Sequence, residues 1–244
     1  MVDVFEEVEE QIRADRYKVL ALRALPWVIG ALVLALLVAL GVWGYQTWRE
    51  KQAFEASDKY AAALEAFAQQ DVSKADGLWG EIAKSGPAGY KALALMQQGG
   101  IKATENKTAE AVALYDQAAK AAPNEIVGDL ARLKSALALL DTAPVTELKT
   151  RLEPLVEEGR PYRAQAREAL AFSKLMANDA PGARADFVVL SLLADAPEAT
   201  RQRARAAMEL IDSGSAASVS AAVKAAATAP AAPPASLVPQ APRP

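Results

Sequence analysis

The sequence predicts an all-α protein in which a single N-terminal transmembrane helix precedes an α-solenoid of about four helix pairs and a capping helix. Three observations support this fold class. Residues 25–48 contain no charged side chain. Helix-favouring residues, alanine above all, dominate the remainder, and the β-branched alternation typical of strands is scarce. One apolar pattern also recurs at intervals of about 36–37 residues.

The apolar run lies between Arg23 and Arg49 and is long enough for a membrane-spanning helix, which takes about 20 residues. We predict a transmembrane helix over residues 24–48, with Pro26 in its first turn. Aromatic residues that favour the membrane interface stand near both ends: Trp27, Trp43, Tyr45 and Trp48. A buried core helix is one alternative. A signal peptide cleaved near residues 39–41 is another, but its apolar region usually has only about 7–15 residues.

Residues 1–23 are predicted to form a cytoplasmic amphipathic tail, with apolar residues near a helical period at Phe5, Val8 and Ile12. This tail serves either as a docking helix or as a solvated lead-in to the membrane. Basic residues are slightly more frequent before the apolar run than after it. The positive-inside rule therefore places the N-terminus in the cytoplasm and the larger C-terminal part across the membrane.

Composition restricts the possible chemistry. The chain has no cysteine and no histidine, which removes thiolate and histidine nucleophiles, histidine bases and the usual zinc ligand sets. We therefore expect no enzyme, cofactor or metal site. A carboxylate-based envelope enzyme is the low-ranked alternative, but the consecutive Glu157 and Glu158 would diverge by about 100° on a helix. The net charge of −3 and the absence of a basic stripe argue against nucleic acid, and nothing indicates a small-molecule substrate.

The recurring pattern consists of a small or apolar residue, a large residue four positions later, another apolar residue three positions later, and then a proline. Its four predicted copies are Ala75/Trp79/Ile82/Pro87, Ala111/Tyr115/Ala118/Pro123, Leu148/Leu152/Leu155/Pro161 and Ala185/Val189/Leu192/Pro197. An amphipathic segment precedes each copy, over residues 54–70, 90–105, 125–140 and 162–178. The period is close to the roughly 34 residues of tetratricopeptide repeats (TPR). We therefore predict a TPR-like α-solenoid over residues 49–211; an irregular helical bundle is the alternative.

Three further segments complete the prediction. Residues 198–211 are expected to form a capping helix with a solvated outer face. Residues 212–244, rich in Ala and Pro, are expected to form a disordered tail. A leucine stripe at Leu130, Leu133, Leu137 and Leu140 either lines an apolar groove or belongs to the core through a change of register near Pro144.

If the concave face of the solenoid binds a peptide, side chains on the first helix of each pair are the candidates. These partner-binding candidates are Tyr60, Leu64, Phe67, Arg167 and Lys174. The alternative for Tyr60, Leu64 and Phe67 is that they are core residues.

Three stretches resemble the YfgM-like family of membrane-anchored TPR-like proteins: residues 5–16 (FEEVEEQIRADR), 86–94 (GPAGYKALA) and 161–170 (PYRAQAREAL). The resemblance covers most of residues 1–211, and the long tail departs from it. It implies a single-pass protein of the bacterial inner membrane with a periplasmic repeat domain. It also implies partnership with the Sec translocon and with a periplasmic chaperone such as PpiD.

The leading hypothesis is therefore a periplasmic interaction scaffold, ancillary to the Sec translocon, that assists export or folding of envelope proteins. A scaffold for cell-wall or outer-membrane assembly machinery is the alternative. A receptor with its repeats in the cytosol is a third hypothesis. A homodimer is a further alternative for the partner of either scaffold.

Overall fold

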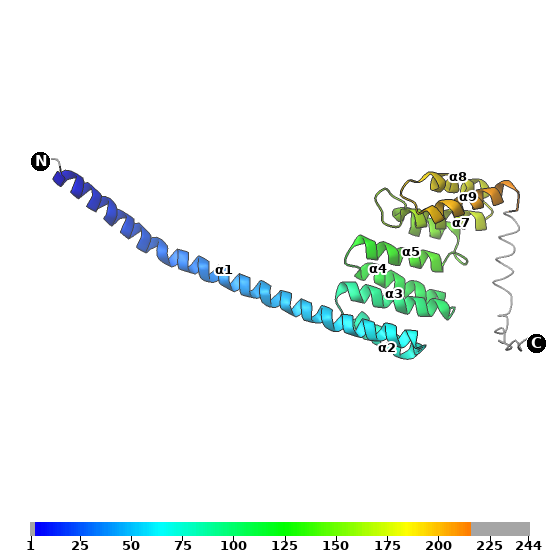
Figure 1. Ribbon diagram of the computed structural model, residues 1–244, viewed down its shortest axis with the longest axis horizontal. Coiled ribbons are helices and arrows are strands. Elements are labelled where there is room, and N and C mark those ends of the chain that lie inside the picture. Colours follow the sequence, from blue (N-terminus) through cyan, green and yellow to red (C-terminus); the bar gives the residue numbers. More distant parts are fainter. Residues whose placement is uncertain (1–2, 216–244) are drawn as a thin grey trace, which may run out of the picture. The chain divides into compact units, whose positions relative to one another are not determined.

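The computed structural model describes residues 3–215, with side chains described for residues 25–27 and 29–215. These residues form nine α-helices and one 3-10 helix, without a strand among them (Figure 1), which confirms the all-α prediction. The helices are α1 Asp3–Ala68, α2 Val72–Ser85, α3 Ala88–Thr104, α4 Thr108–Ala121, α5 Glu125–Ala138, α6 Val145–Leu152, η1 Glu153–Leu155, α7 Arg163–Met176, α8 Ala180–Leu192 and α9 Glu198–Asp212. The side chains of the predicted amphipathic tail, and the predicted disordered tail from residue 216 onward, lie outside the described residues.

The chain divides into two compact units, Met1–Asp58 and Lys59–Pro244. In the first unit, α1 is already helical from Asp3, so Pro26 lies inside the helix and not in its first turn. The missing N–H of proline removes one helical hydrogen bond, a loss that membrane helices tolerate. From Leu25 onward, α1 is long and apolar enough to cross a membrane, judged by length and composition alone.

The aromatic side chains predicted for the membrane interface are all exposed on the first unit: Trp27, Trp43, Tyr45 and Trp48. The rings of Tyr45 and Trp48 lie 6.1 Å apart between centroids. The guanidinium of Arg49 lies 5.8 Å from the centroid of the Tyr45 ring. An aromatic pair beside the first cation after the apolar run is typical of the position where a membrane-spanning helix passes through the headgroup level, and α1 continues beyond it to Ala68.

The second unit consists of helix pairs that stack on one another in the order of the sequence. The last turns of α1 pair with α2 through a shared core, and α3–α4, α5–α6 and α7–α8 follow in order (Figure 1). Each helix from α2 to α8 contacts the next helix, and α3 contacts α5, α5 contacts α7, and α7 contacts α9. This stacking makes a continuous core that no pair could form alone, as in other α-solenoids.

Three of the four pairs are closed by the same turn. Gln70, Asn106 and Asn178 have φ angles of 64°, 59° and 63°, each two residues after the end of the first helix of its pair. The left-handed conformation at this position ends a helix, and asparagine tolerates it better than most residues. Asp71 and Asp179 then cap the following helices through their side-chain oxygens. The third pair instead uses the longer connection over residues 139–144.

The first three copies of the apolar pattern are buried as predicted: Ala75/Trp79/Ile82, Ala111/Tyr115/Ala118 and Leu148/Leu152/Leu155. The predicted fourth copy is wrong. Ala185 is exposed, and Val189 and Leu192 are 42% and 78% exposed.

The buried residues of the fourth pair are Ala183, Phe187 and Leu190, which have the same spacing but lie two positions earlier. Pro87 follows Ile82 by five positions, whereas Pro197 follows Leu190 by seven, because the connection between α8 and α9 is longer. The assumption of a constant distance to the proline therefore predicted the wrong buried face of α8.

The leucine stripe on α5 is mostly core. Leu133 is buried, and Leu130 and Leu140 are partly buried against neighbouring apolar residues. Leu137 differs, because 46% of it is exposed. The final helix, α9, buries Thr200, Ala204 and Ala207, and its exposed residues are mostly polar, as expected for a cap.

Candidate protein-binding surface

The first helices of the pairs present one side that packs against no second helix. On α3, Ala94 and Ile101 join the core with α2, and Met96 joins the core with α4. At 100° per residue, Leu93 and Gly100 lie on a third side of α3, where both are only partly buried, although Leu93 still packs against the core shared with α4. This geometry leaves a partly exposed strip along α3 at the edge of its contact with α4.

The same construction applies to α5. Ala131 joins the core with α4, while Leu133 and Ala136 join the core with α6. Ile126 and Leu137 point between these directions and are 59% and 46% exposed. Ile126 and Leu137 thus leave large apolar side chains in water on α5, next to the partly exposed strip of α3.

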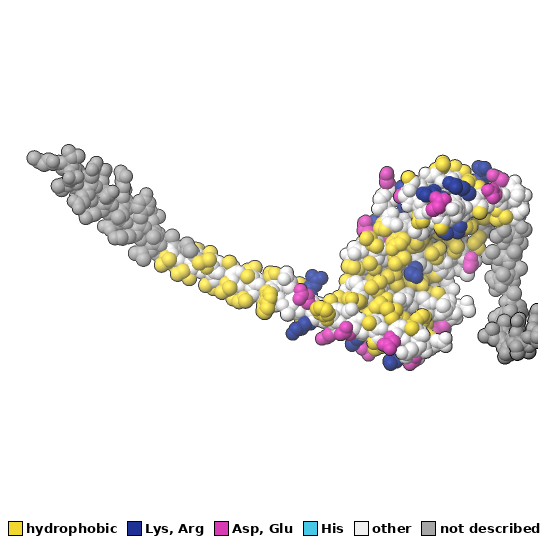
Figure 2. Space-filling view, in the orientation of Figure 1, with side chains coloured by type: hydrophobic (Ala, Val, Ile, Leu, Met, Phe, Trp, Pro, Cys, Tyr) yellow, Lys and Arg dark blue, Asp and Glu magenta, His cyan; other side chains and the backbone are white. Residues whose placement is uncertain are grey.

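We call the resulting area the inner apolar surface, and it consists of Leu93, Ile126, Leu130 and Leu137. Figure 2 shows apolar side chains gathered over α3 and α5, with few charged groups among them. A contiguous exposed apolar area is a feature of surfaces that bind proteins or peptides. The spacing of Ile126, Leu130 and Leu137 along one side of α5 is the signal in the sequence that identifies its largest part.

The predicted binding residues at the end of α1 divide into two kinds. Leu64 and Phe67 are exposed, although the Phe67 ring also lies 5.6 Å from the Trp79 ring between centroids. Tyr60 is only partly exposed; its ring packs near Trp79 and Tyr90, and its hydroxyl accepts a hydrogen bond of 3.0 Å from Gln97 Nε2. Leu64 is therefore available to a partner, and Tyr60 chiefly joins α1 to α3.

Arg167 and Lys174 lie on α7, in a different pair. Lys174 Nζ lies 2.6 Å and Arg167 Nη1 3.6 Å from the carboxylate of Asp186 on α8. Both cations are thus compensated within their own pair. The structure does not bring them together with Tyr60, Leu64 and Phe67.

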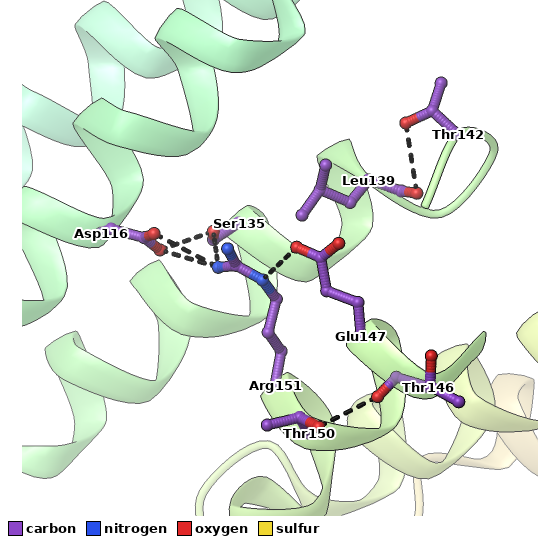
Figure 3. Close-up of polar contacts among 8 residues, drawn as sticks. All are labelled: Asp116, Ser135, Leu139, Thr142, Thr146, Glu147, Thr150 and Arg151. Atoms are coloured by element: carbon purple, nitrogen blue, oxygen red, sulfur yellow. Dashed lines mark hydrogen bonds and ion pairs between the residues drawn. The ribbon is translucent and has the colours of Figure 1, made fainter. Parts of the chain in front are cut away.

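Polar contacts on the other sides of the helices hold neighbouring pairs together (Figure 3). Arg151 Nη1 on α6 donates to both carboxylate oxygens of Asp116 on α4, each at 3.2 Å, and to Ser135 Oγ on α5 at 3.0 Å. Ser135 Oγ also donates to Asp116 at 2.6 Å. Three helices from two pairs are joined by this network, which fixes the relative positions of α4 and α5.

Two ion pairs join the last helices. Arg203 on α9 donates two hydrogen bonds, of 2.6 and 2.8 Å, to the mostly buried carboxylate of Glu168 on α7, and these bonds raise the pKa of Arg203. Arg184 on α8 forms a similar two-bond pair with Asp212 on α9, at 2.7 and 2.9 Å. Bidentate pairs of this kind also set the orientation of the helices they join.

The Arg184–Asp212 pair predicts a dependence of stability on pH. Hydrogen bonding from Arg184 lowers the pKa of Asp212. A carboxyl group with a lowered pKa stabilises the fold above its unfolded pKa, which is about 3.9 for Asp, and this contribution is lost as the pH falls through the folded value. Asp212→Asn should therefore lower the melting temperature at pH 7 but make no difference at about pH 2. Asp141→Asn, on an exposed carboxylate of the α5–α6 connection, is the control; an Asp212→Asn deficit that persists at pH 2 would contradict the assignment.

Comparison with known families identifies the fold. A family model described as a tetratricopeptide repeat-like domain matches residues 25–169, more than half of the chain. The chain belongs to this family. Comparisons with curated proteins and with solved structures found no significant match.

Membership agrees with the stack of helix pairs and confirms the predicted TPR-like α-solenoid. TPR-like folds are typically non-enzymatic and bind protein partners on surfaces made by successive repeats. In the part of the chain that the structure describes, no group of three or more acidic residues is placed to hold a metal ion. The coarse function that follows is a protein–protein interaction scaffold that carries a candidate membrane-spanning helix.

Proposed function

We propose that this protein is a single-pass scaffold of the bacterial inner membrane that acts beside the Sec translocon and a periplasmic chaperone such as PpiD. In this proposal residues 1–23 lie in the cytoplasm, residues 24–48 cross the membrane, and residues 49–211 form a periplasmic interaction domain followed by the tail over 212–244. The domain assists export or folding of envelope proteins by binding partner proteins.

The inner apolar surface is the observation that carries the proposal. Ile126 and Leu137 on this surface are exposed, Leu93 and Leu130 are partly exposed, and burying apolar area contributes about 25 cal/mol per Å². A partner that offers apolar side chains, as incompletely folded envelope proteins do, would gain this free energy on binding.

The apolar N-terminal helix and the likeness to YfgM-like proteins support the location. A membrane anchor confines the domain to the space next to the membrane, where translocated chains emerge. The local concentration of such chains is high there, so weak contacts at the inner apolar surface would suffice for function.

Site-specific photo-crosslinking tests the proposal. With p-benzoylphenylalanine at Leu137, on the inner apolar surface, we expect crosslinks in native membranes to a translocon subunit, a periplasmic chaperone or an emerging envelope protein. Lys120, exposed on α4, is the matched control position and should give few or none. Crosslinks to cell-wall or outer-membrane assembly proteins in their place would reject the Sec assignment.

Protease treatment of intact spheroplasts tests the orientation. The periplasmic proposal expects the repeat domain to be digested while the N-terminal tail stays protected. Protection of the repeat domain would instead place it in the cytosol and would overturn the proposed topology.

A further inference from the structure

The end of α9 repeats the turn that joins the two helices of a pair. Gly214 lies two residues after the end of α9 and has a φ of 75°. The same position has a positive φ after the first helix of three pairs: Gln70, Asn106 and Asn178. Among residues 3–215, no other position two residues after a helix has a positive φ. In this part of the chain the turn therefore marks the first helix of a pair.

The hydrogen bonding of the turn and the place of α9 in the stack agree with this assignment. The N–H of Gly214 donates to the carbonyl of Ile211 at 3.0 Å. The equivalent bonds, from the turn residue to the carbonyl three positions earlier, measure 3.0, 3.1 and 3.0 Å in the other three turns. Left-handed residues end many helices, so the turn alone would not identify a first helix. However, α9 also contacts α7 in the way that α5 contacts α3, as successive first helices do.

The second helices of the three pairs bury their side chains in one register relative to the turn residue. The buried positions lie five, nine and twelve residues after it: Ala75/Trp79/Ile82, Ala111/Tyr115/Ala118 and Ala183/Phe187/Leu190. Applied to Gly214, this register selects Val219, Val223 and Ala226. Val219 and Val223 are the only apolar residues larger than alanine between residues 212 and 229. Both large apolar side chains of the segment therefore fall on the register.

The residues after Gly214 also suit a helix of the expected length. The second helices α2, α4 and α8 begin two residues after the turn residue and contain 13 or 14 residues. An equivalent helix would begin at residue 216, in a segment rich in alanine, the most helix-favouring residue. Ser215 occupies the N-cap position, where serine is favoured. Pro230 disfavours a helical residue before it, so the helix would span about residues 216–228.

The docking surface for this helix consists of Ala207, Leu210 and Ile211 on α9. Ile211 lies three positions before the turn residue, where Leu175 of α7 is only 7% exposed and joins the core that contains Phe187 of α8. Ile211 and Leu210 are less buried, since the described residues contain no second helix after α9. Ala207 lies seven positions before the turn residue, and the equivalent residues on three other first helices are also small: Ala63, Gly99 and Ala171.

We propose that residues 216–228 form the second helix of a fifth pair and dock on this surface of α9. Val223 takes the place that large aromatic residues take in the other pairs. An alanine-rich helix of this length is marginal alone in water, so burial of the valines against α9 holds it in place. The chain's own segment is the occupant because the turn tethers it next to α9, which gives it a high effective concentration there. The solenoid then has five pairs, and only residues 229–244 remain as a tail.

Hydrogen–deuterium exchange of the full chain in detergent micelles, measured by mass spectrometry, tests this proposal. We expect the amides of residues 219–228 to exchange at least about tenfold more slowly than in an unstructured peptide of the same sequence. Val223→Glu should remove this protection, because a carboxylate is costly to bury. The same variant should also speed exchange in the last turns of α9, which lose their cover.

Ala225→Glu is the matched control. It lies eleven residues after Gly214, where the other second helices have exposed residues: Glu81, Gln117 and Val189. It adds the same charge to the same helix and should keep the protection. A wild-type segment without protection, protection that survives Val223→Glu, or equal loss in both variants would each overturn the proposal. Neither variant alters the inner apolar surface, so this inference and the proposed function fail independently.

Discussion

Phe187→Ala should destabilise the repeat domain by about 3–5 kcal/mol, the usual cost of removing a large aromatic side chain from a packed core. Phe187 is fully buried, and its ring meets that of Phe172 edge-on at 5.1 Å between centroids. It lies in the core shared by α7, α8 and α9, so the resulting cavity weakens the contacts of three helices. Urea unfolding of the full chain in detergent, followed by circular dichroism, measures the loss.

Val189→Ala is the matched control, because it shortens an apolar side chain two positions away on the same helix. Val189 is exposed, so we expect a change of only about 0.5 kcal/mol or less. The two variants test which face of α8 is buried: the face with Phe187, as in the structure, or the face with Val189, as the sequence pattern predicted. A larger loss for Val189→Ala than for Phe187→Ala would contradict the structure.

Gly99→Ala should destabilise the domain by about 1–3 kcal/mol, in the range of overpacked core substitutions. A Cβ at Gly99 would lie 2.7 Å from Cε1 and 2.9 Å from Cδ1 of Tyr115. The Tyr115 ring is itself buried between α3 and α4, so it cannot move aside without disturbing that core. The clash should outweigh the gain of up to about 1 kcal/mol that alanine normally brings to a helix interior.

Gly100→Ala tests the same backbone effect without the clash. A Cβ there would lie 3.9 Å from the Tyr115 hydroxyl oxygen, an ordinary contact. We therefore expect stabilisation by about 0.5–1 kcal/mol, because glycine is costly in a helix. Opposite signs for these two adjacent substitutions, measured by urea unfolding, would support the close approach of α3 and α4. Stabilisation by both would show that Tyr115 does not pack against Gly99.

Local sequence patterns were sufficient for most of the architecture. Ala75, Trp79 and Ile82 repeat at helical spacing with a proline after them, and this spacing depends only on the geometry of one helix. The αL positions Asn106 and Asn178 likewise follow from a local preference of asparagine. The pattern failed at the fourth pair because the length of the α8–α9 connection depends on how α9 packs. Residue spacing within a single helix contains no information about that packing.

The candidate surfaces were predictable only in part. Leu64 is exposed, whereas Arg167 and Lys174 form ion pairs with Asp186 from the second helix of their own pair. The sequence provides the charge of these side chains but not the neighbour that compensates it. Ion pairing between helices is decided by the angle at which they pack.

The amino-acid sequence by itself determined an all-α chain with a long apolar N-terminal helix, paired helices and no cysteine or histidine chemistry. These properties follow from composition and from periodicity within single helices. Only the tertiary structure decided that Phe187 and not Val189 is buried and that Leu137 stays exposed. Each of these depends on side chains distant in sequence meeting in the stack, and such meetings are set by packing between helices rather than by the order of residues along one helix.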